Sequence, residues 1–326
     1  MLLSTRLQAA RIHLRIACLA IAMFLPGISL ALPPIRIVVP YAAGGTLDAM
    51  ARLLARHMYA GTDQTVIIEN RPGGDNTVGT RQVVRAAPDG RTLLIVSTAF
   101  AVVAAMQPLD YDVQRDLAPV IKVATGEMFL AAHGGLDVQS VGDLKRVAQL
   151  RPGGLNCAGL PGQTALACDR LARLLDVPMV TIPFHSLAPA INALAAGHVD
   201  VIFTPRGAVQ SLASPQIRVL AAATAGPPAP PYQNLPLLKD RWPNMVMTTS
   251  AGIYVPSGTS ASVVASLNRE LNRVVALPEV RSTLVELGYT IVGGGPEVLA
   301  RNLSEELTFY RQLVLDTKSK MDAGNQ

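Results

Sequence analysis

The fold is decided by residues 35–56, which read IRIVVPYAAGGTLDAMARLLAR. Residues 35–39 are nearly all apolar, which is the pattern of a strand buried in a parallel sheet. A turn with Gly44 and Gly45 follows, and Thr46 is expected to cap the helix that the apolar spacing then predicts. Free backbone N–H groups and a helix dipole meet at such a turn, so it favours a bound anion. The alternative is a plain strand-to-helix turn whose glycines serve only the chain geometry.

A second glycine-rich turn follows the same plan. Residues 65–69 (TVIIE) form the next predicted strand, residues 70–79 (NRPGGDNTVG) form the turn, and a helix is expected from about residue 80 to residue 87. A third strand is predicted at residues 92–97. Strands that alternate with helices at this spacing indicate βαβ units and a parallel sheet. Right-handed crossovers would place both glycine turns at the same edge of that sheet.

The alternation restarts after residue 120. A third small-residue turn spans residues 159–164 (GLPGQT), and residues 184–186 (FHS) follow a later strand. Residues 226–231 (GPPAPP) indicate a stiff connection without regular structure. The remaining strands are predicted at 129–132, 155–158, 180–183, 199–203, 219–223 and 251–255, and the remaining helices at 141–150, 165–175, 189–196, 278–287 and 296–317, with a further helix capped by Thr259 and ending near residue 276.

Residues 1–31 have the features of a secretory signal peptide. Three arginines precede the apolar run of residues 16–25, and residues 29–31 (SLA) fit a small-x-small cleavage site. Cleavage is therefore expected after Ala31, which leaves a secreted mature chain. A lipoprotein site at Cys18 is the alternative, and it is disfavoured because the apolar run before that cysteine is too short.

Composition and cysteine content exclude several classes of protein. The chain has 326 residues, 50% of them hydrophobic, which is enough for a large core. Cleavage after Ala31 removes three arginines and no acid, so the net charge falls from +5 to +2, too little for nucleic-acid binding. Cys157 and Cys168 could pair in an oxidising compartment, but two buried free thiols are the simpler interpretation. No histidine stands at a metal-ligand spacing from them, so neither a metal nor another cofactor is predicted.

No catalytic motif is present. Ser97, Ser186 and Ser257 lie in no G-x-S-x-G frame, and the sequence contains no H-E-x-x-H. A nucleophile needs a base and a group that orients the base, and no such set is evident. The sequence therefore predicts a binding protein and not an enzyme.

Longer segments resemble the periplasmic solute-binding proteins of tripartite tricarboxylate transporters, often called the Bug family. The combination of ENRPG at 69–73 with APDGRTLL at 87–94 is the most specific part of the resemblance. The matches keep their order along nearly the whole mature chain. The other matching segments are PYAAGGTLDAMAR (40–52), IPFHSLAPA (182–190), AAGHVDVIF (195–203), VPSGTS (255–260) and LPEVRSTLVELG (277–288).

This resemblance implies an α/β fold with the two-domain clamshell of type II periplasmic binding proteins, each domain being a mainly parallel sheet flanked by helices. Residues 32–127 and 252–326 would form the first domain, and residues 128–251 would form the second, with a hinge near Gly126 and Gly252. A small carboxylate would bind in the interdomain cleft and pass to a membrane permease. The alternative is a periplasmic sensor that presents its ligand to a membrane sensor kinase. The chain is expected to be a monomer.

The resemblance also implies where the ligand binds. Backbone groups and water from the first two glycine loops would hold a carboxylate, and loops of the second domain would close over it. The residues assigned to the ligand in this way are Tyr41, Ala43, Gly44, Gly45, Thr46, Asp48, Gly74, Asp75, Asn76, Thr77, Gly159, Gly162, Gln163, Thr164, Phe184, His185 and Thr204.

Several positions depart from the family pattern. Asp75 and Asn76 replace small residues, and His185 stands where a lysine is common. We expect Asp75 to face the cleft and pair with a cation on the ligand, which would favour an amino acid or another zwitterion; the alternative is that it points to solvent. We favour a bond from Asp48 to the start of the helix over a contact with the ligand. We likewise favour a role for Arg71 in holding its loop over a role as a carboxylate clamp.

Overall fold

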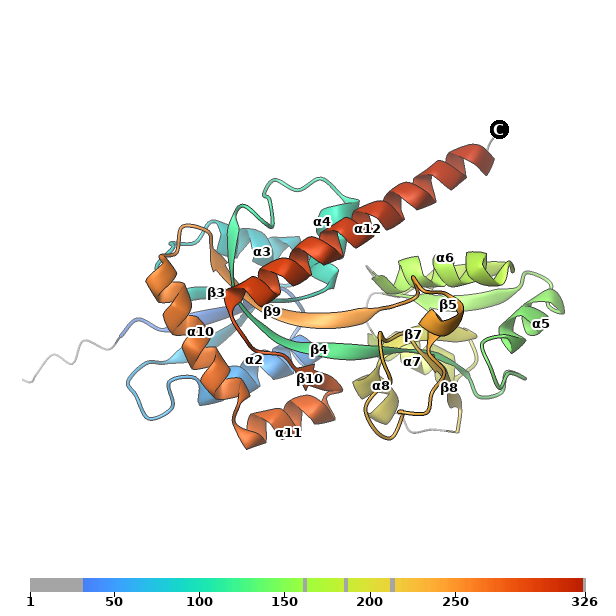
Figure 1. The fold of residues 1–326 in the computed structure, drawn as a ribbon, viewed down its shortest axis with the longest axis horizontal. Helices are drawn as coiled ribbons and strands as arrows, with labels where there is room; N and C mark the ends of the chain where they lie inside the picture. Colours follow the sequence, from blue (N-terminus) through green and yellow to red (C-terminus); the bar gives the residue numbers. More distant parts are fainter. Residues whose placement is uncertain (1–31, 161–162, 185–186, 212–214, 325–326) are drawn as a thin grey trace, which may run out of the picture. The chain divides into compact units, whose positions relative to one another are not determined.

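The computed structural model describes residues 32–160, 163–184, 187–211 and 215–324. Residues 34–326 form one compact unit, drawn in Figure 1. Some sequence-based predictions lie outside the described residues, namely the signal peptide with its cleavage site, Gly162 and His185. Among the described residues, no helix combines the length and the apolar character that crossing a membrane requires.

Parallel strands occupy both ends of a ten-stranded sheet. At one end, β1 (Ile35–Val39) lies between β2 (Val66–Asn70) and β3 (Thr92–Ser97) and is parallel to both. At the other end, β5 (Leu155–Gly159) lies between β6 (Met179–Pro183) and β7 (Val201–Pro205) and is parallel to both. These are the predicted βαβ units. Because β1 and β2 run in the same direction, the first two glycine turns follow at one edge of the sheet.

Two long antiparallel strands join these ends. β4 (Leu117–His133) pairs with β9 (Thr248–Pro256) and with β7, and β9 pairs with β3. Two further strands, β8 (Ile217–Ala222) and β10 (Tyr289–Ile291), also pair with β4. The sequence predicted only residues 129–132 and 251–255 of the two long strands. Pro119 and Gly126, both inside β4, break the apolar pattern from which that strand is read.

The two glycines assigned to a hinge have a packing role. Gly126 lies inside β4, and a Cβ there would be 2.5 Å from Thr249 Cγ2. Gly252 lies inside β9, and a Cβ there would be 2.6 Å from Leu299 Cδ1. Each strand therefore needs glycine where a neighbouring side chain lies against its backbone. The division into two domains and the hinge between them remain predictions.

Helices cover both faces of the sheet at each end (Figure 1). At the β1 end, the first hydrophobic core lies under α2 (Thr46–His57), α10 (Ala261–Val275) and α11 (Pro278–Glu286). The opposite face is covered by α3 (Thr77–Val84), α4 (Ala99–Met106) and α12 (Pro296–Gly324). At the β5 end, the helices are α5 (Asp143–Gln149), α6 (Gln163–Leu175) and α9 (Leu238–Arg241) on one face and α7 (Leu187–Ala195) and α8 (Arg206–Ser211) on the other.

Several helix starts differ from the prediction. Thr46 is the first residue of α2 and does not cap it; Gly45 is the N-cap, and no side chain bonds there. The helix after the second glycine turn begins at Thr77 rather than residue 80, because the N–H of Thr77 closes the turn on the carbonyl of Gly74 at 3.0 Å. Ser260, not Thr259, caps α10 through its hydroxyl. The short α4 was not predicted because its sequence, AFAVVAAM, is apolar all round and shows no helical stripe.

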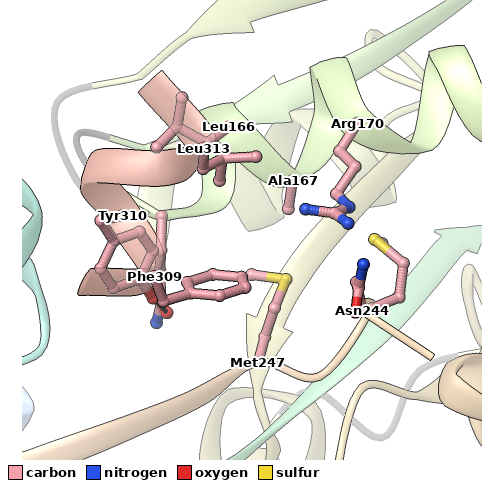
Figure 2. Close-up of a pocket in the computed structure, with 10 residues that line it drawn as sticks. Leu166, Ala167, Arg170, Asn244, Met247, Phe309, Tyr310 and Leu313 are labelled. Carbon is pink, nitrogen blue, oxygen red and sulfur yellow. Dashed lines mark hydrogen bonds between the residues drawn. The ribbon is translucent and has the colours of Figure 1, made fainter. Parts of the chain in front are cut away.

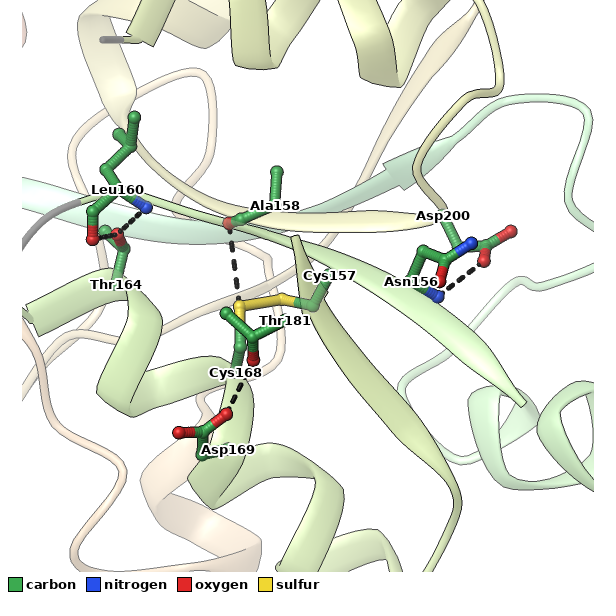
Figure 3. The surroundings of a disulfide bond; sticks show 9 residues. All are labelled: Asn156, Cys157, Ala158, Leu160, Thr164, Cys168, Asp169, Thr181 and Asp200. Atoms are coloured by element: carbon green, nitrogen blue, oxygen red, sulfur yellow. Dashed lines mark hydrogen bonds between the residues drawn. A yellow bond between two sulfur atoms is a disulfide. The ribbon is translucent and has the colours of Figure 1, made fainter. Parts of the chain in front are cut away.

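Cys157 and Cys168 form a disulfide, so the interpretation as free thiols was wrong (Figure 3). Cys157 lies in β5 and Cys168 in α6, and both side chains are fully buried. Their Cα atoms are 5.9 Å apart, within the range that a disulfide requires. A spacing of 11 residues does not reveal this contact, because it depends on how α6 packs back against β5.

Candidate ligand-binding loops

The first glycine loop presents free backbone donors at a helix start. Ala43, Gly44, Gly45 and Thr46 are all exposed. Gly44 has φ +83°, a conformation that favours glycine, whereas Gly45 is extended with φ −78° and ψ 169°. Among the described residues, the N–H groups of Thr46 and Leu47 have no acceptor, as expected for the first turn of a helix. The loop therefore has the geometry of an anion site.

Asp48 holds this loop in place. Its Oδ2 accepts from the N–H of Gly44 at 2.9 Å and from Arg52 Nε at 3.0 Å, and its Oδ1 accepts from Asn70 Nδ2 at 2.9 Å. The side chain is 3% exposed. Burial raises the pKa of Asp48, but the hydrogen bonds from Arg52, Gly44 and Asn70 outweigh it and hold the pKa below its usual value. The carboxylate of Asp48 thus accepts hydrogen bonds from the loop and from the start of the helix, which is the role favoured from the sequence.

The second loop differs from the first in its donors. The N–H of Thr77 bonds to Gly74 O, and the N–H of Val78 bonds to Gly73 O at 3.4 Å. These N–H groups are therefore used within the turn. What the loop presents instead is polar side chains. Asp75 is exposed with φ +50°, and Asn76 is buried with φ +71° as the N-cap of α3.

The amide oxygen of Asn76 has no partner among the described residues although it is buried. A buried acceptor without a donor is rare and unfavourable. Arg71, at the start of the same loop, is paired with Glu69 through Nε at 2.7 Å, and its backbone N–H bonds to Val39 O at 2.8 Å. Arg71 therefore holds its loop in place, which is the role favoured from the sequence.

Tyr41 lies behind the first loop. Its hydroxyl is 3.1 Å from Ser97 Oγ and accepts from the N–H of Ser97 at 3.3 Å. Burial raises the pKa of Tyr41, partly opposed by these two bonds to Ser97. The hydroxyl thus joins the end of β3 to the second residue after β1, while part of the residue remains exposed.

The predicted ligand residues near the start of α6 are hydrogen-bonded or packed within the protein. Thr164 is 5% exposed; its Oγ1 accepts from the N–H of Leu160 at 2.8 Å and donates to Leu160 O at 3.0 Å. Gln163, the first residue of α6, accepts from the hydroxyl of Tyr310 at 2.7 Å. Gly159 ends β5, where a Cβ would be 2.5 Å from Thr181 Cγ2. Close packing on β6 therefore accounts for this glycine.

The last two predicted ligand residues are Phe184, which follows β6, and Thr204, which lies in β7. Phe184 is half-buried, and its N–H bonds to Gly159 O at 2.9 Å. Thr204 is completely buried, and its hydroxyl has no partner among the described residues. Thr204 and Asn76 are thus the two predicted site residues with a buried oxygen that the described protein leaves without a partner.

Arg206 is a buried charge that the sequence did not single out as functional. Its Nε lies 3.2 Å from Glu127 Oε2, and Nη2 donates to Val285 O at 3.3 Å. The side chain is 2% exposed. Glu127 belongs to β4 and Val285 to α11, so Arg206 connects α8 to both. Breaking a buried pair of this kind typically costs about 3–5 kcal/mol, which indicates a structural role.

Two cavities lie on another part of the molecule, beside α12. The first, in Figure 2, lies between α6, α12 and residues 244–247 and has a volume of about 10 Å³, room for roughly one water. The second has a volume of about 330 Å³. Of the predicted ligand residues that the structure describes, Gln163 alone lines either of these two. The lining of the second is Pro243, Asn244, Val246, Thr248, Asn302, Glu305, Glu306, Phe309 and Tyr310.

Glu306 is the half-buried centre of a polar cluster beside the second cavity, in which Thr98 and Ser250 are buried. Its Oε1 accepts from Thr98 Oγ1 at 2.9 Å and from Ser250 Oγ at 3.1 Å. Burial raises the pKa of Glu306, although bonds from Asn302, Thr98 and Ser250 and the charge of Lys122 oppose the shift. Among the described residues, no three His, Cys, Asp or Glu side chains come together as a metal site.

Comparison with known proteins shows what the chain is similar to. It is 32% identical over 289 residues to a UPF0065 protein in the tcbD-tcbE intergenic region of Pseudomonas sp. strain P51, covering 87% of this chain and 86% of the relative. Among solved structures it resembles MatC (Rpa3494) of Rhodopseudomonas palustris, which holds malate, with a TM-score of 0.76, 28% identity and coverage of 86% and 98% of the two chains. It also resembles the periplasmic binding protein BugD, with a TM-score of 0.75, 26% identity and coverage of 87% and 98%.

These matches confirm the predicted α/β binding-protein fold and the resemblance to the Bug proteins. The family model described as tripartite tricarboxylate transporter family receptor matches residues 50–316, most of the chain. The members are receptors, which confirms the prediction that the chain is a binding protein and not an enzyme. The chain belongs to the TctC family of tripartite tricarboxylate transporter receptors.

Proposed function

We propose that the protein captures a small carboxylate at the first turn of α2 and delivers it to a membrane permease. The observation that carries this proposal is the pair of N–H groups at Thr46 and Leu47, without acceptors in the described chain, next to an exposed loop braced by Asp48. Such groups stabilise a negative charge without any cationic side chain. The malate bound to MatC, a relative of the same fold, supports a carboxylate ligand.

The second half of the site is proposed on the β5 end of the sheet. The buried hydroxyl of Thr204, in β7 at that end, lacks a partner in the described chain, as does the amide oxygen of Asn76 in the second glycine loop at the β1 end. A ligand that supplied hydrogen bonds to them would relieve an unfavourable burial. In this proposal the two domains close over the ligand about β4 and β9, because ligand contacts from both domains favour the closed state.

We further propose that the mature protein works in the periplasm. The disulfide between Cys157 and Cys168 supports this location, because disulfides persist in oxidising compartments. The likeness to the periplasmic BugD supports it as well. A pull-down with membrane proteins distinguishes delivery to a permease from presentation to a sensor kinase.

We propose that Asp75 makes the site prefer a ligand with a cationic group over a plain dicarboxylate. It is exposed and makes no ion pair among the described residues. A carboxylate at this loop would repel a plain dicarboxylate and attract a ligand with a cationic group. Titrations of wild type and Asp75→Gly with aspartate and with succinate test this. We expect the substitution to weaken aspartate and strengthen succinate; unchanged affinities for both would remove the basis for a zwitterionic ligand.

The proposed function is tested by isothermal titration of mature protein with mono-, di- and tricarboxylates and with amino acids. A saturable heat for one class is expected, together with recovery of the ligand unchanged. A thermal-shift screen provides a first selection, since a ligand at 100 times its Kd adds about 2.7 kcal/mol of stability. Small-angle scattering should then show a smaller radius of gyration at saturation. Absence of binding to every carboxylate tested would contradict the proposal.

A further inference from the structure

Tyr310 links α12 to the first residue of α6. Its hydroxyl donates to Gln163 Oε1 at 2.7 Å, and the residue is 5% exposed. Leu166 of α6 and Leu313 of α12 belong to the same small buried cluster as Tyr310, together with Val102 of α4. Figure 2 shows Tyr310, Leu313 and Leu166 beside one another at the edge of the small cavity. The contact thus combines one buried hydrogen bond with a small apolar cluster.

The two helices belong to different ends of the sheet. Earlier residues of α12, Leu299, Leu303 and Leu307, pack in the core that contains Val38 of β1. In contrast, α6 packs in the core under β5 and β7 and is joined to β5 by the disulfide. The Tyr310 hydroxyl therefore connects the scaffold of the first glycine loop to the scaffold of the first turn of α6.

The bond is made at the position where α6 meets the preceding loop. Gln163 bonds outward to Tyr310, whereas the next residue, Thr164, closes the loop through Leu160 N and O. The orientation of the first turn of α6 is thus set by Tyr310 on one side and by Leu160 on the other. Met245 and Met247, which line the small cavity between α6 and α12, have flexible side chains.

We propose that Tyr310 is a positioning residue for ligand binding: its bond to Gln163 holds the first turn of α6 in the orientation that the ligand-bound state requires. This inference rests on the proposed function, in which the β5 end of the sheet closes on the ligand. Tyr310 does not touch the ligand in this account. Its effect on the ligand is indirect: the bond to Gln163 stabilises the ligand-bound state. Loosening this bond therefore makes the bound state less favourable and ligand dissociation faster.

The test is Tyr310→Phe, which removes the hydroxyl and keeps the ring. The matched control is Tyr254→Phe, a tyrosine that is 3% exposed in β9, with no described contact to α6. With malate as the probe, Tyr310→Phe is expected to weaken binding about two- to tenfold, the range of one net hydrogen bond. The loss should appear in the dissociation rate. The control should bind as wild type does.

A double-mutant cycle with Gln163→Met separates this role from general destabilisation. If the bond positions α6, Tyr310→Phe has no further effect on malate affinity in the Gln163→Met background. Hydrogen exchange across residues 163–169 should also rise in Tyr310→Phe, with and without malate, and stay unchanged in Tyr254→Phe. Wild-type affinity and exchange in Tyr310→Phe would overturn the inference, as would an equal loss in both backgrounds.

Failure of the proposed function would look different. If wild-type protein bound neither malate nor any other carboxylate, the proposed function would be wrong. Exchange in the ligand-free variants would then still decide whether Tyr310 orders the first turn of α6: unchanged exchange in Tyr310→Phe rejects the inference.

Discussion

Asn70 and Asp48 join the first two glycine loops, since Asn70 Nδ2 donates to Asp48 Oδ1 at 2.9 Å. The same amide group of Asn70 also donates to Tyr41 O at 3.2 Å, and Arg52 Nη2 donates to Asn70 Oδ1 at 3.2 Å. The end of β2 is thereby bonded to the first turn of α2 and to the segment that follows β1. The open N–H groups of the first loop owe their position to this network rather than to the glycines alone.

Replacing Asp48 by Asn should therefore loosen both loops. The variant loses a charge that accepts three hydrogen bonds, and we expect about 1–3 kcal/mol of lost stability at pH 7. Because the pKa of Asp48 is lowered in the folded protein, its contribution is present above the unfolded pKa and is lost as the pH falls through the folded value. Thermal unfolding from pH 7 down to pH 2 checks this: the gap between wild type and variant should narrow in acid. Asp89→Asn, at an exposed turn, is the control.

Gly45→Val should abolish carboxylate binding while the protein still folds. The extended conformation, with φ −78°, accepts a side chain, and a Cβ at Gly45 would be 3.5 Å from Ala42 O, an ordinary contact. The new side chain would stand over the free N–H groups. The positive φ lies at Gly44, so backbone strain is not the mechanism expected at Gly45.

Gly226→Val is the matched control for this prediction, since a Cβ at Gly226 meets nothing within 4 Å. Circular dichroism and titration calorimetry are the measurements. Normal folding with normal affinity in Gly45→Val would show that this loop does not hold the ligand.

Loss of the disulfide should destabilise the β5 end of the sheet. Cross-linking a loop of about this length contributes roughly 3 kcal/mol through the unfolded state. For a chain of this size that corresponds to roughly 6–12 °C in Tm for the Cys157→Ser/Cys168→Ser variant. Wild-type protein in a strong reductant should approach the variant, and the variant itself should not respond to the reductant. Equal Tm values with and without the bond would contradict the expectation.

Glu306→Gln should raise stability at neutral pH and have little effect in acid. The raised pKa of Glu306 means that its contribution is fully present below the unfolded pKa and is lost as the pH rises through the folded value. Glutamine can still accept from Thr98 and Ser250 without a buried charge, although it gives up the attraction of Lys122. We expect a higher Tm at pH 8 and a vanishing difference near pH 4. Glu305→Gln, an exposed neighbour, is the control; a Tm gain that is equal at both pH values would refute the assignment.

Elements that depend on neighbouring residues could be predicted from the sequence. The apolar run of β1, the glycine turn and the stripe of α2 all lie between Ile35 and His57, and their local pattern predicts a strand, a turn and a helix. The order of strands and helices then predicted parallel βαβ units, which form the two ends of the sheet. The family followed from segments spread along the chain, and the comparisons confirmed it.

Contacts between distant side chains became visible in the three-dimensional structure. The partner of Tyr310 is 147 residues away in the sequence, and Asp48 bonds to Asn70 across 22 residues. The disulfide and the antiparallel pairing of β4 with β9 depend in the same way on packing between distant segments. Local periodicity reports which face of a segment is buried, whereas hydrogen bonds and ion pairs depend on where the opposite segment lies. For that reason the open N–H groups of the first loop could be predicted from the sequence, and the network that holds them in place could not.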